Sequence, residues 1–327
     1  MIKTIVSKIP AVNDGLILST CVVLSSIATY FIMGIEATLW STLSVLHAYN
    51  IFSKPKDYKS YLYSFICSMS ILVGIYLGYF LKLGYLFYFA LIILSFFYYQ
   101  LYDIDPALDL SMKYIIIFST IGTTFTEDII KGLVVGLLIG TVLTLLVCYS
   151  LSHKEHLKTH ISTLQIRERV LKFKLATVLR SLVYSAGLIA CLFFSIHLNI
   201  GHFFWALLTF VFVLHPKSQS IVKLTIQRIA GTLLAVLLLY FLFNTPMMPY
   251  IGFVSILILA FLLPMSNERN YAFASFCTTG FVLAVLEMSL YWQTPNYQLL
   301  SERILETLLG GFIALICSII LKYVRNK

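Results

Sequence analysis

Long apolar runs separated by short polar turns fill almost the whole chain. Several runs are shorter than the ~20 residues that an upright helix needs to cross a bilayer, and regular alternation over β-barrel lengths is absent. The pattern therefore predicts membrane helices rather than strands. Segments 36–52 and 202–215 are the weakest, and each either crosses fully or forms a half-helix. The twelve predicted segments are roughly 15–33, 36–52, 60–80, 83–102, 110–126, 129–150, 176–198, 202–215, 224–243, 248–265, 271–291 and 303–323.

Composition makes the bilayer the expected solvent for this chain. Of its 327 residues, 60% are hydrophobic and 11% are charged, whereas soluble domains carry about 25% charged residues. The net charge of +9 is spread over loops, linker and termini, which argues against a soluble protein that binds nucleic acid. No small-residue cleavage site follows Lys3 and Lys8, so the first segment is interpreted as an uncleaved span.

Charge predicts the orientation in the membrane. With a cytoplasmic amino terminus and a crossing at every segment, 20 of the 23 Lys and Arg residues lie on the cytoplasmic side. The outer side receives only Lys82, Lys131 and Arg303. This positive-inside bias supports an even number of crossings with both termini in the cytoplasm.

An internal repeat divides the chain. A shift of 165 residues places Trp40 on Trp205 and Tyr85 on Tyr250, and near the end of each half the shift becomes 175. Six spans per copy make the copies face the same way, with a shared pathway between them. The predicted fold is an all-α polytopic membrane protein of about 12 transmembrane helices in two parallel six-helix repeats. The predicted parts are a first repeat over 1–151, a basic cytoplasmic amphipathic linker over 152–174 and a second repeat over 175–327.

Histidine and cysteine positions bear on metal chemistry. His153, His156 and His160 in the linker have a spacing that imitates a metal site, but they lack nearby carboxylate or thiol partners, so solvated side chains are favoured. The six cysteines lie inside apolar runs without a close CxxC pair and are expected to act as small apolar residues. We therefore predict no metal, no cofactor and no structural disulfide.

Charges invert between the two copies near their last helices. At the shift of 175, Asp128 corresponds to Arg303, and Lys131 corresponds to Glu306. If these helices meet across a pseudo-twofold axis, Asp128–Arg303 and Lys131–Glu306 form inter-repeat ion pairs, because charges in lipid need partners or water. The alternative is that all four side chains lie among the outer headgroups.

Two motifs resemble a known family. The run from Trp205 to Thr209, followed by a polar turn and then by Arg228, Gly231 and Thr232, is similar to the signature of the fusaric acid resistance (FUSC) and aromatic acid exporter superfamily. Arg303, Thr307 and Gly310 are similar to its second motif. The resemblance implies an inner-membrane efflux transporter for small organic, including aromatic, acids that works beside a periplasmic membrane fusion protein of the HlyD type. The resemblance is to the short members of the superfamily, which lack the large soluble domain of other members.

Several residues are candidates for the substrate pathway. Arg228 can hold a carboxylate with its planar fork, and Thr232 lies one turn further along the helix; the alternative is an arginine that sets orientation and packing. Trp40 and Trp205 can stack on an aromatic ring, although interfacial packing is the commoner use of such residues. His215 ends the eighth segment and is a further candidate.

Proton coupling has its own candidates. Glu287 lies in an apolar run without a basic residue three or four positions away. A carboxylate there needs a cavity or a proton, or else it is hydrated at the outer surface near Trp292. His47 ends the second segment, and histidine changes charge near neutral pH; an interfacial histidine is the simpler interpretation.

Three functional classes suit a chain of this composition. The leading one is a proton-coupled exporter of small organic anions, and an organic-anion channel is the alternative. A membrane-embedded enzyme acting on lipid needs acidic or histidine clusters in longer loops, and no GxxxxGK[ST], HExxH or GxSxG motif occurs. The predicted partners are therefore the organic anion, membrane lipid and the fusion protein. The oligomeric state stays open, a homo-oligomer included.

Overall fold

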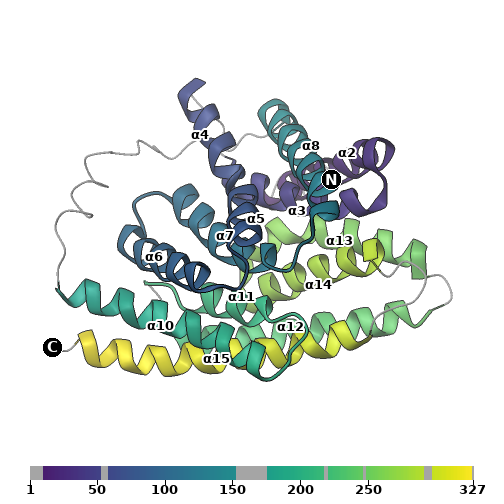
Figure 1. The fold of residues 1–327 in the computed structure, drawn as a ribbon. Coiled ribbons are helices and arrows are strands. Elements are labelled where there is room, and N and C mark those ends of the chain that lie inside the picture. Colours follow the sequence, from purple (N-terminus) through teal and green to yellow (C-terminus); the bar gives the residue numbers. More distant parts are fainter. Residues whose placement is uncertain are drawn as a thin grey trace. The chain divides into compact units, whose positions relative to one another are not determined.

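A computed structural model describes residues 10–52, 58–151, 175–216, 220–245, 248–290 and 297–325 (Figure 1). Every regular element in these ranges is an α-helix. The predicted linker at 152–174 lies outside the described residues. The helices are α2 (Pro10–Met33), α3 (Ile35–Ile51), α4 (Tyr58–Ser68), α5 (Ser70–Leu81), α6 (Tyr85–Leu101), α7 (Pro106–Gly122), α8 (Glu127–Leu151), α10 (Leu175–His197), α11 (Phe204–Val213), α12 (Ile221–Phe243), α13 (Met248–Arg269), α14 (Tyr271–Leu290) and α15 (Tyr297–Arg325).

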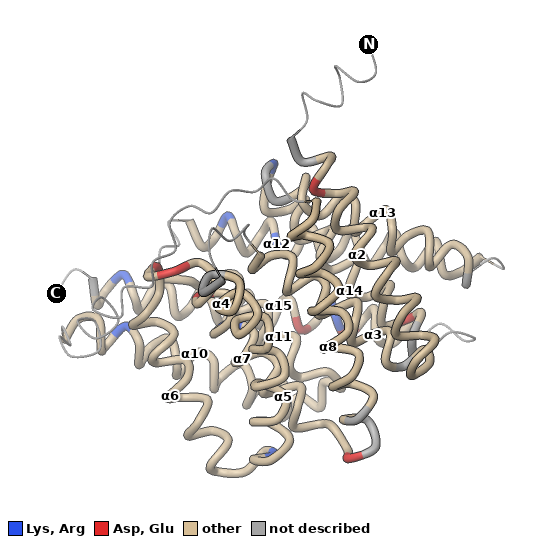
Figure 2. The backbone as a smooth tube through the Cα atoms, turned by 90° about the horizontal axis from the view of Figure 1, so that it is seen from above, with Lys and Arg blue, Asp and Glu red and all other residues tan. Residues whose placement is uncertain are grey.

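Each predicted apolar segment coincides with a helix, and the third is interrupted at Met69 between α4 and α5. Figure 2 shows that long stretches of helix carry no charged residue. In the described part of the chain, 7 spans are long and apolar enough to cross a membrane. They are Val12–Met33, Tyr61–Leu81, Gly132–Leu151, Leu175–His197, Ile221–Phe243, Tyr271–Met288 and Tyr297–Val324. The all-helical membrane fold is therefore confirmed, while twelve full crossings remain a prediction.

The helix α11 is short for a membrane helix. It has 10 residues, which corresponds to about 15 Å of helix, whereas the hydrocarbon core of a bilayer is about 30 Å thick. It ends at Val213, two residues before His215. This length agrees with a half-helix, one of the two alternatives for segment 202–215.

The chain forms two compact units that do not coincide with its two halves. Unit 1 takes residues 1–68, 127–156 and 230–301, and unit 2 takes 69–126, 157–229 and 302–327. Each unit thus combines helices from both halves of the sequence. The division of the sequence into 1–151, 152–174 and 175–327 stays a prediction about repeats rather than a description of compact bodies.

The same helix pairs contact each other in both units. In unit 1, α2 packs against α13 and α3 against α14; in unit 2, α10 packs against α6 and α11 against α7. In both cases the first helix of one half contacts the fourth helix of the other half, and the second contacts the fifth. The recurrence supports the internal repeat, and the parallel orientation of the copies stays a prediction.

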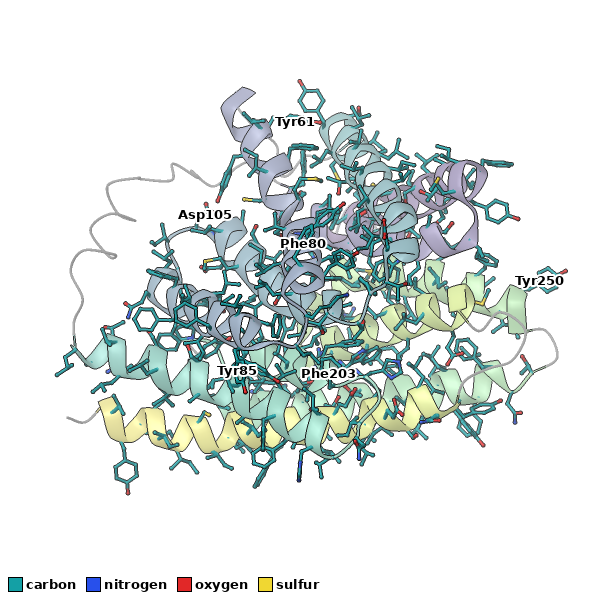
Figure 3. All side chains as sticks on the ribbon, in the orientation of Figure 1. Tyr61, Phe80, Tyr85, Asp105, Phe203 and Tyr250 are labelled. Atoms are coloured by element: carbon teal, nitrogen blue, oxygen red, sulfur yellow. The ribbon has the colours of Figure 1, made fainter. Side chains whose placement is uncertain are left out.

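Side chains agree with this repeat. Ser95 on α6 donates a hydrogen bond from its hydroxyl to the hydroxyl of Ser185 on α10, with 2.8 Å between the oxygens. In the corresponding pair of unit 1, the Ser19 hydroxyl on α2 lies 3.4 Å from the Leu257 carbonyl on α13. Tyr85 and Tyr250, equivalent at the shift of 165, are 96% and 73% exposed (Figure 3).

Glycines allow backbones to meet in each unit. A β-carbon added to Gly136 of α8 would collide with the carbonyl oxygen of Ala37 on α3, and one added to Gly310 of α15 would collide with that of Ala206 on α11. Small residues at membrane helix contacts permit this approach. The last helix of each half therefore packs against the second helix of the same half by the same device.

We expect Gly136→Ala to destabilise the protein by about 1–3 kcal/mol, because the added methyl forces α8 away from α3. The matched control is Gly132→Ala on the same helix, where the nearest atom to an added β-carbon is the Ala37 β-carbon at 3.9 Å. That change should be neutral or stabilise by up to ~1 kcal/mol. Thermal unfolding in detergent measures the stability of both variants. A melting temperature of Gly136→Ala equal to or above that of Gly132→Ala would contradict the close contact.

Candidate functional site

Five residues of unit 2 form a cluster at the start of α15 and α11, called here the ionic cluster: His202, Trp205, Glu302, Arg303 and Glu306. Glu302 and Glu306 are four positions apart on α15 and therefore share a helix face. His202 lies in the turn before α11, and Trp205 lies in the first turn of that helix. The contact of Gly310 with Ala206 holds the two helices together one turn beyond the charges.

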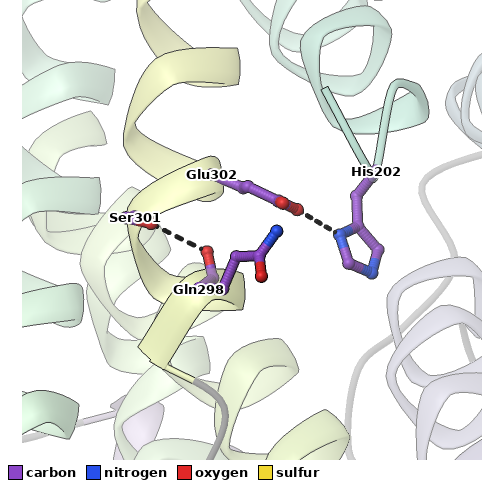
Figure 4. A network of polar contacts seen from close by, with 4 residues as sticks. All are labelled: His202, Gln298, Ser301 and Glu302. Atoms are coloured by element: carbon purple, nitrogen blue, oxygen red, sulfur yellow. Dashed lines mark hydrogen bonds and ion pairs between the residues drawn. The ribbon is translucent and has the colours of Figure 1, made fainter. Parts of the chain in front are cut away.

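The His202 Nδ1 and Glu302 Oε2 atoms lie 2.7 Å apart (Figure 4). The two side chains are 33% and 13% exposed, so this pair is the accessible part of the cluster. An added β-carbon at Gly201 would lie 2.9 Å from Glu302 Oε2. The absence of a side chain at this position therefore lets the carboxylate approach the turn.

Arg303 is fixed by one aromatic residue in two ways. Its Nη1 donates a hydrogen bond to the Trp205 carbonyl oxygen at 3.3 Å, and its guanidinium lies 4.3 Å from the centre of the Trp205 ring. Both residues are buried, and a desolvated cation–π contact of this kind contributes about 2 kcal/mol. Trp205 of the first motif thus holds Arg303 of the second motif in place.

Glu306 is the most enclosed member of the ionic cluster. It is 0% exposed, and neither carboxylate oxygen has a hydrogen-bond partner among the described residues. The charges that act on it are those of Arg303 and Glu302 on the same helix. A buried carboxyl without hydrogen bonds is rare and is a mark of function in membrane helices.

The other end of α11 carries a second group, called here the basic aromatic cluster: Tyr102, Lys113, Phe212, His215 and Arg228. Lys113 Nζ lies 5.7 Å from the centre of the Phe212 ring, and Arg228 Cζ lies 5.9 Å from it. Tyr102 stacks on His215 with 5.7 Å between ring centres, and the Tyr102 hydroxyl lies 3.2 Å from His215 Nδ1. Two cations therefore share one aromatic ring.

Local structure positions Lys113 in this cluster. The Asp105 Oδ1 accepts hydrogen bonds from the backbone N–H groups of Ala107 and Leu108, which caps the amino terminus of α7. Pro106 occupies the first helical position, where its fixed φ favours the helix. Lys113 then follows two turns into α7. The cap fixes where α7 begins and so where its lysine meets Phe212.

His215 is electrically neutral at physiological pH. It follows the end of α11, and its burial, together with the positive charge of Lys113, lowers its pKa from 6.5 to about 4. Protonation would place a third cation beside Lys113 and Arg228. At neutral pH the His215 ring in this cluster therefore carries no charge.

The remaining predicted residues lie in unit 1. Trp40 is half-buried on α3, and His47 on the same helix is 0% exposed, with its Nε2 3.3 Å from the Cys67 carbonyl oxygen. Glu287 on α14 is also 0% exposed, and Thr232 on α12 is 1% exposed. Arg228 and Thr232, neighbours in the motif, thus belong to different units.

The predicted ion pairs Asp128–Arg303 and Lys131–Glu306 stay predictions. Asp128 and Lys131 lie in α8, but their side chains lie outside the described ones. The sequence alone assigned no site role to His202, Glu302, Tyr102 or Phe212. The available signal was the shortness of segment 202–215, which puts polar residues at both ends of a half-length helix.

Together the fold and the two clusters define an α-helical membrane protein with buried charges beside aromatic rings, the class to which membrane transporters belong. Residues 188–317 match the family described as fusaric acid resistance protein-like. The match confirms the resemblance over these residues, which include both motifs and most of both clusters. No curated protein and no solved structure matches the chain.

We expect acid to destabilise the protein partly through His215. Because its pKa in the folded protein is lowered to about 4, its contribution to stability is complete above pH 6.5 and is lost as the pH falls through about 4. The variant His215→Asn should therefore lose less stability than the parent over this range. Melting temperatures measured across the range test this, and parallel curves for the two proteins would refute it.

Proposed function

We propose that the protein exports small organic acids, aromatic acids among them, across the bacterial inner membrane. The observation that carries the proposal is the basic aromatic cluster, in which Lys113 and Arg228 both lie beside the Phe212 ring. The family match supports transport, and this cluster supplies the chemistry that a carboxylate with an aromatic ring requires. The substrate class, the direction and the coupling are parts of the proposal.

The basic aromatic cluster suits a carboxylate substrate. Arg228 presents a planar fork that matches a carboxylate, and Lys113 adds a second positive charge beside the same Phe212 ring. The rings of Phe212 and Tyr102 offer faces on which an aromatic acid can stack. The cluster combines residues of both halves of the sequence, so the binding site in this proposal lies where the halves meet in unit 2.

The rest of the proposal follows the family resemblance and the charge pattern. Both termini are cytoplasmic, and the exporter works beside a membrane fusion protein of the HlyD type, with a homo-oligomer as one form of the assembly. Export is coupled to protons, for which Glu287 and His47 are the candidates in unit 1. Both side chains are fully buried, as a coupling group shielded from bulk water should be.

A flux assay with two matched probes tests the proposal. Phthalate and succinate are both dicarboxylates, and only phthalate carries a ring. In proteoliposomes, Arg228→Gln should lower the flux of both by about tenfold or more, since a charged hydrogen bond is worth ~1.5–3 kcal/mol. Lys223→Gln on the same helix is the control, because Lys223 is exposed, and it should leave the flux unchanged.

Substitution of Phe212 separates charge from stacking. Phe212→Leu should lower phthalate flux several-fold, because ring stacking contributes about 0.5–1.5 kcal/mol, and should leave succinate flux near that of the parent. Flux of neither probe, or equal flux in Arg228→Gln and the parent, would contradict the proposal. A steady anion current without any pH gradient would assign the protein to the channels instead.

A further inference from the structure

We propose that His202, Glu302 and Glu306 form the proton entry route of this transporter, with Glu306 as the group that carries the proton. This proposal rests on the proposed function for the use made of the proton. The site itself is defined by the structure of unit 2 alone. It differs from the coupling residues considered so far, Glu287 and His47, which lie in unit 1.

Exposure falls along the three side chains. His202 is 33% exposed, Glu302 is 13% exposed, and Glu306 is 0% exposed. The first two are joined by the 2.7 Å contact between His202 Nδ1 and Glu302 Oε2. Glu302 and Glu306 are one turn apart on α15, where β-carbons are about 5–6 Å from each other. Side chains at this spacing lie on the same face of the helix, so the two carboxyl groups are neighbours along the proposed route.

Each member has chemistry suited to its place. His202 is the most exposed of the three side chains and forms the entrance, which the predicted topology places at the outer surface. Glu302 accepts the proton from His202 and passes it inward. Glu306 has neither carboxylate oxygen hydrogen-bonded within the described residues, and a carboxyl in such surroundings can hold a proton without breaking an existing hydrogen bond.

Arg303 makes the cycle electrically feasible. When Glu306 releases its proton toward the inside, its negative charge lies one turn from the guanidinium that Trp205 holds in place. The charge is therefore compensated without movement of the arginine. Uptake of the next proton through Glu302 restores the neutral carboxyl, so each cycle moves one proton inward and leaves the protein unchanged.

Charged and titratable groups on the neighbouring elements are few. Residues 204–213 of α11 include none. The described part of α10 carries Arg180 and His197 at its two ends, besides Tyr184 and Cys191, and α12 carries Lys223 and Arg228 in unit 2. The charged side chains that act on Glu306 are Arg303 and Glu302 on its own helix.

Infrared spectroscopy tests the site without any substrate. The purified protein should show a protonated carboxyl band that shifts in D₂O and disappears in Glu306→Gln; Glu306→Asp should shift the band rather than remove it. A spectrum of Glu306→Gln identical to that of the parent would overturn the proposal. Should Glu306→Gln fail to fold, the aspartate variant decides by the position of its band.

The entrance is tested by the rate at which this band exchanges into deuterium. His202→Phe and Glu302→Gln should each slow the exchange by about tenfold or more, because they remove the accessible end of the route. The matched controls are His197→Phe and Glu127→Gln, which alter an exposed histidine near the same turn and the exposed repeat counterpart of Glu302. Exchange that is equally fast in all variants would refute the route.

Transport then tests the use of the proton. With phthalate as the probe, Glu306→Gln should abolish the acceleration of flux by a pH gradient and keep the flux at equal pH. Acceleration that persists in this variant contradicts the coupling role. Absence of phthalate and succinate flux in the parent would refute the proposed function, whereas the infrared band and its exchange would still decide whether the proton site exists.

Discussion

The backbone contact between α15 and α11 at Gly310 determines the arrangement of the ionic cluster in unit 2. Because no side chain separates Gly310 from the Ala206 carbonyl, the first turns of α15 lie directly against the start of α11. Arg303 can then reach the carbonyl and the ring of Trp205, and Glu302 can reach His202. A larger residue at position 310 would separate both pairs at once.

The shortness of α11 brings the charged groups at its two ends close to each other. A helix of 10 residues covers about half of the hydrocarbon thickness, so charged groups at its two ends lie closer together than the two surfaces of a bilayer. One end carries Arg303 with Trp205, and the other carries Arg228 with Phe212. A cation beside an aromatic ring thus occurs at both ends of one short helix.

The sequence was sufficient to predict the helices and insufficient to predict which helices pack against each other. Apolar runs and charge placement locate segments such as 224–243, because transfer into lipid depends on composition alone. They do not specify that α10 packs on α6, since lipid-facing and helix-facing apolar side chains look alike. The repeat alignment singled out Glu306 as a counterpart of Lys131, but only the fold brings its helix beside His202. Tyr102 and Lys113 could not be linked to Phe212, because roughly a hundred residues, the polar linker among them, separate each of the two from Phe212.

Each compact unit combines helices from both halves of the sequence, and only this arrangement brings Tyr102 and Lys113 to Phe212 and Arg228. Cysteines at Ser95 and Ser185, whose hydroxyl oxygens are 2.8 Å apart, test it most directly in a variant whose six native cysteines are replaced. If the units combine both halves, the cysteines at positions 95 and 185 should form a disulfide within one chain on mild oxidation in the membrane. No bond, or a bond only between two chains, would contradict it.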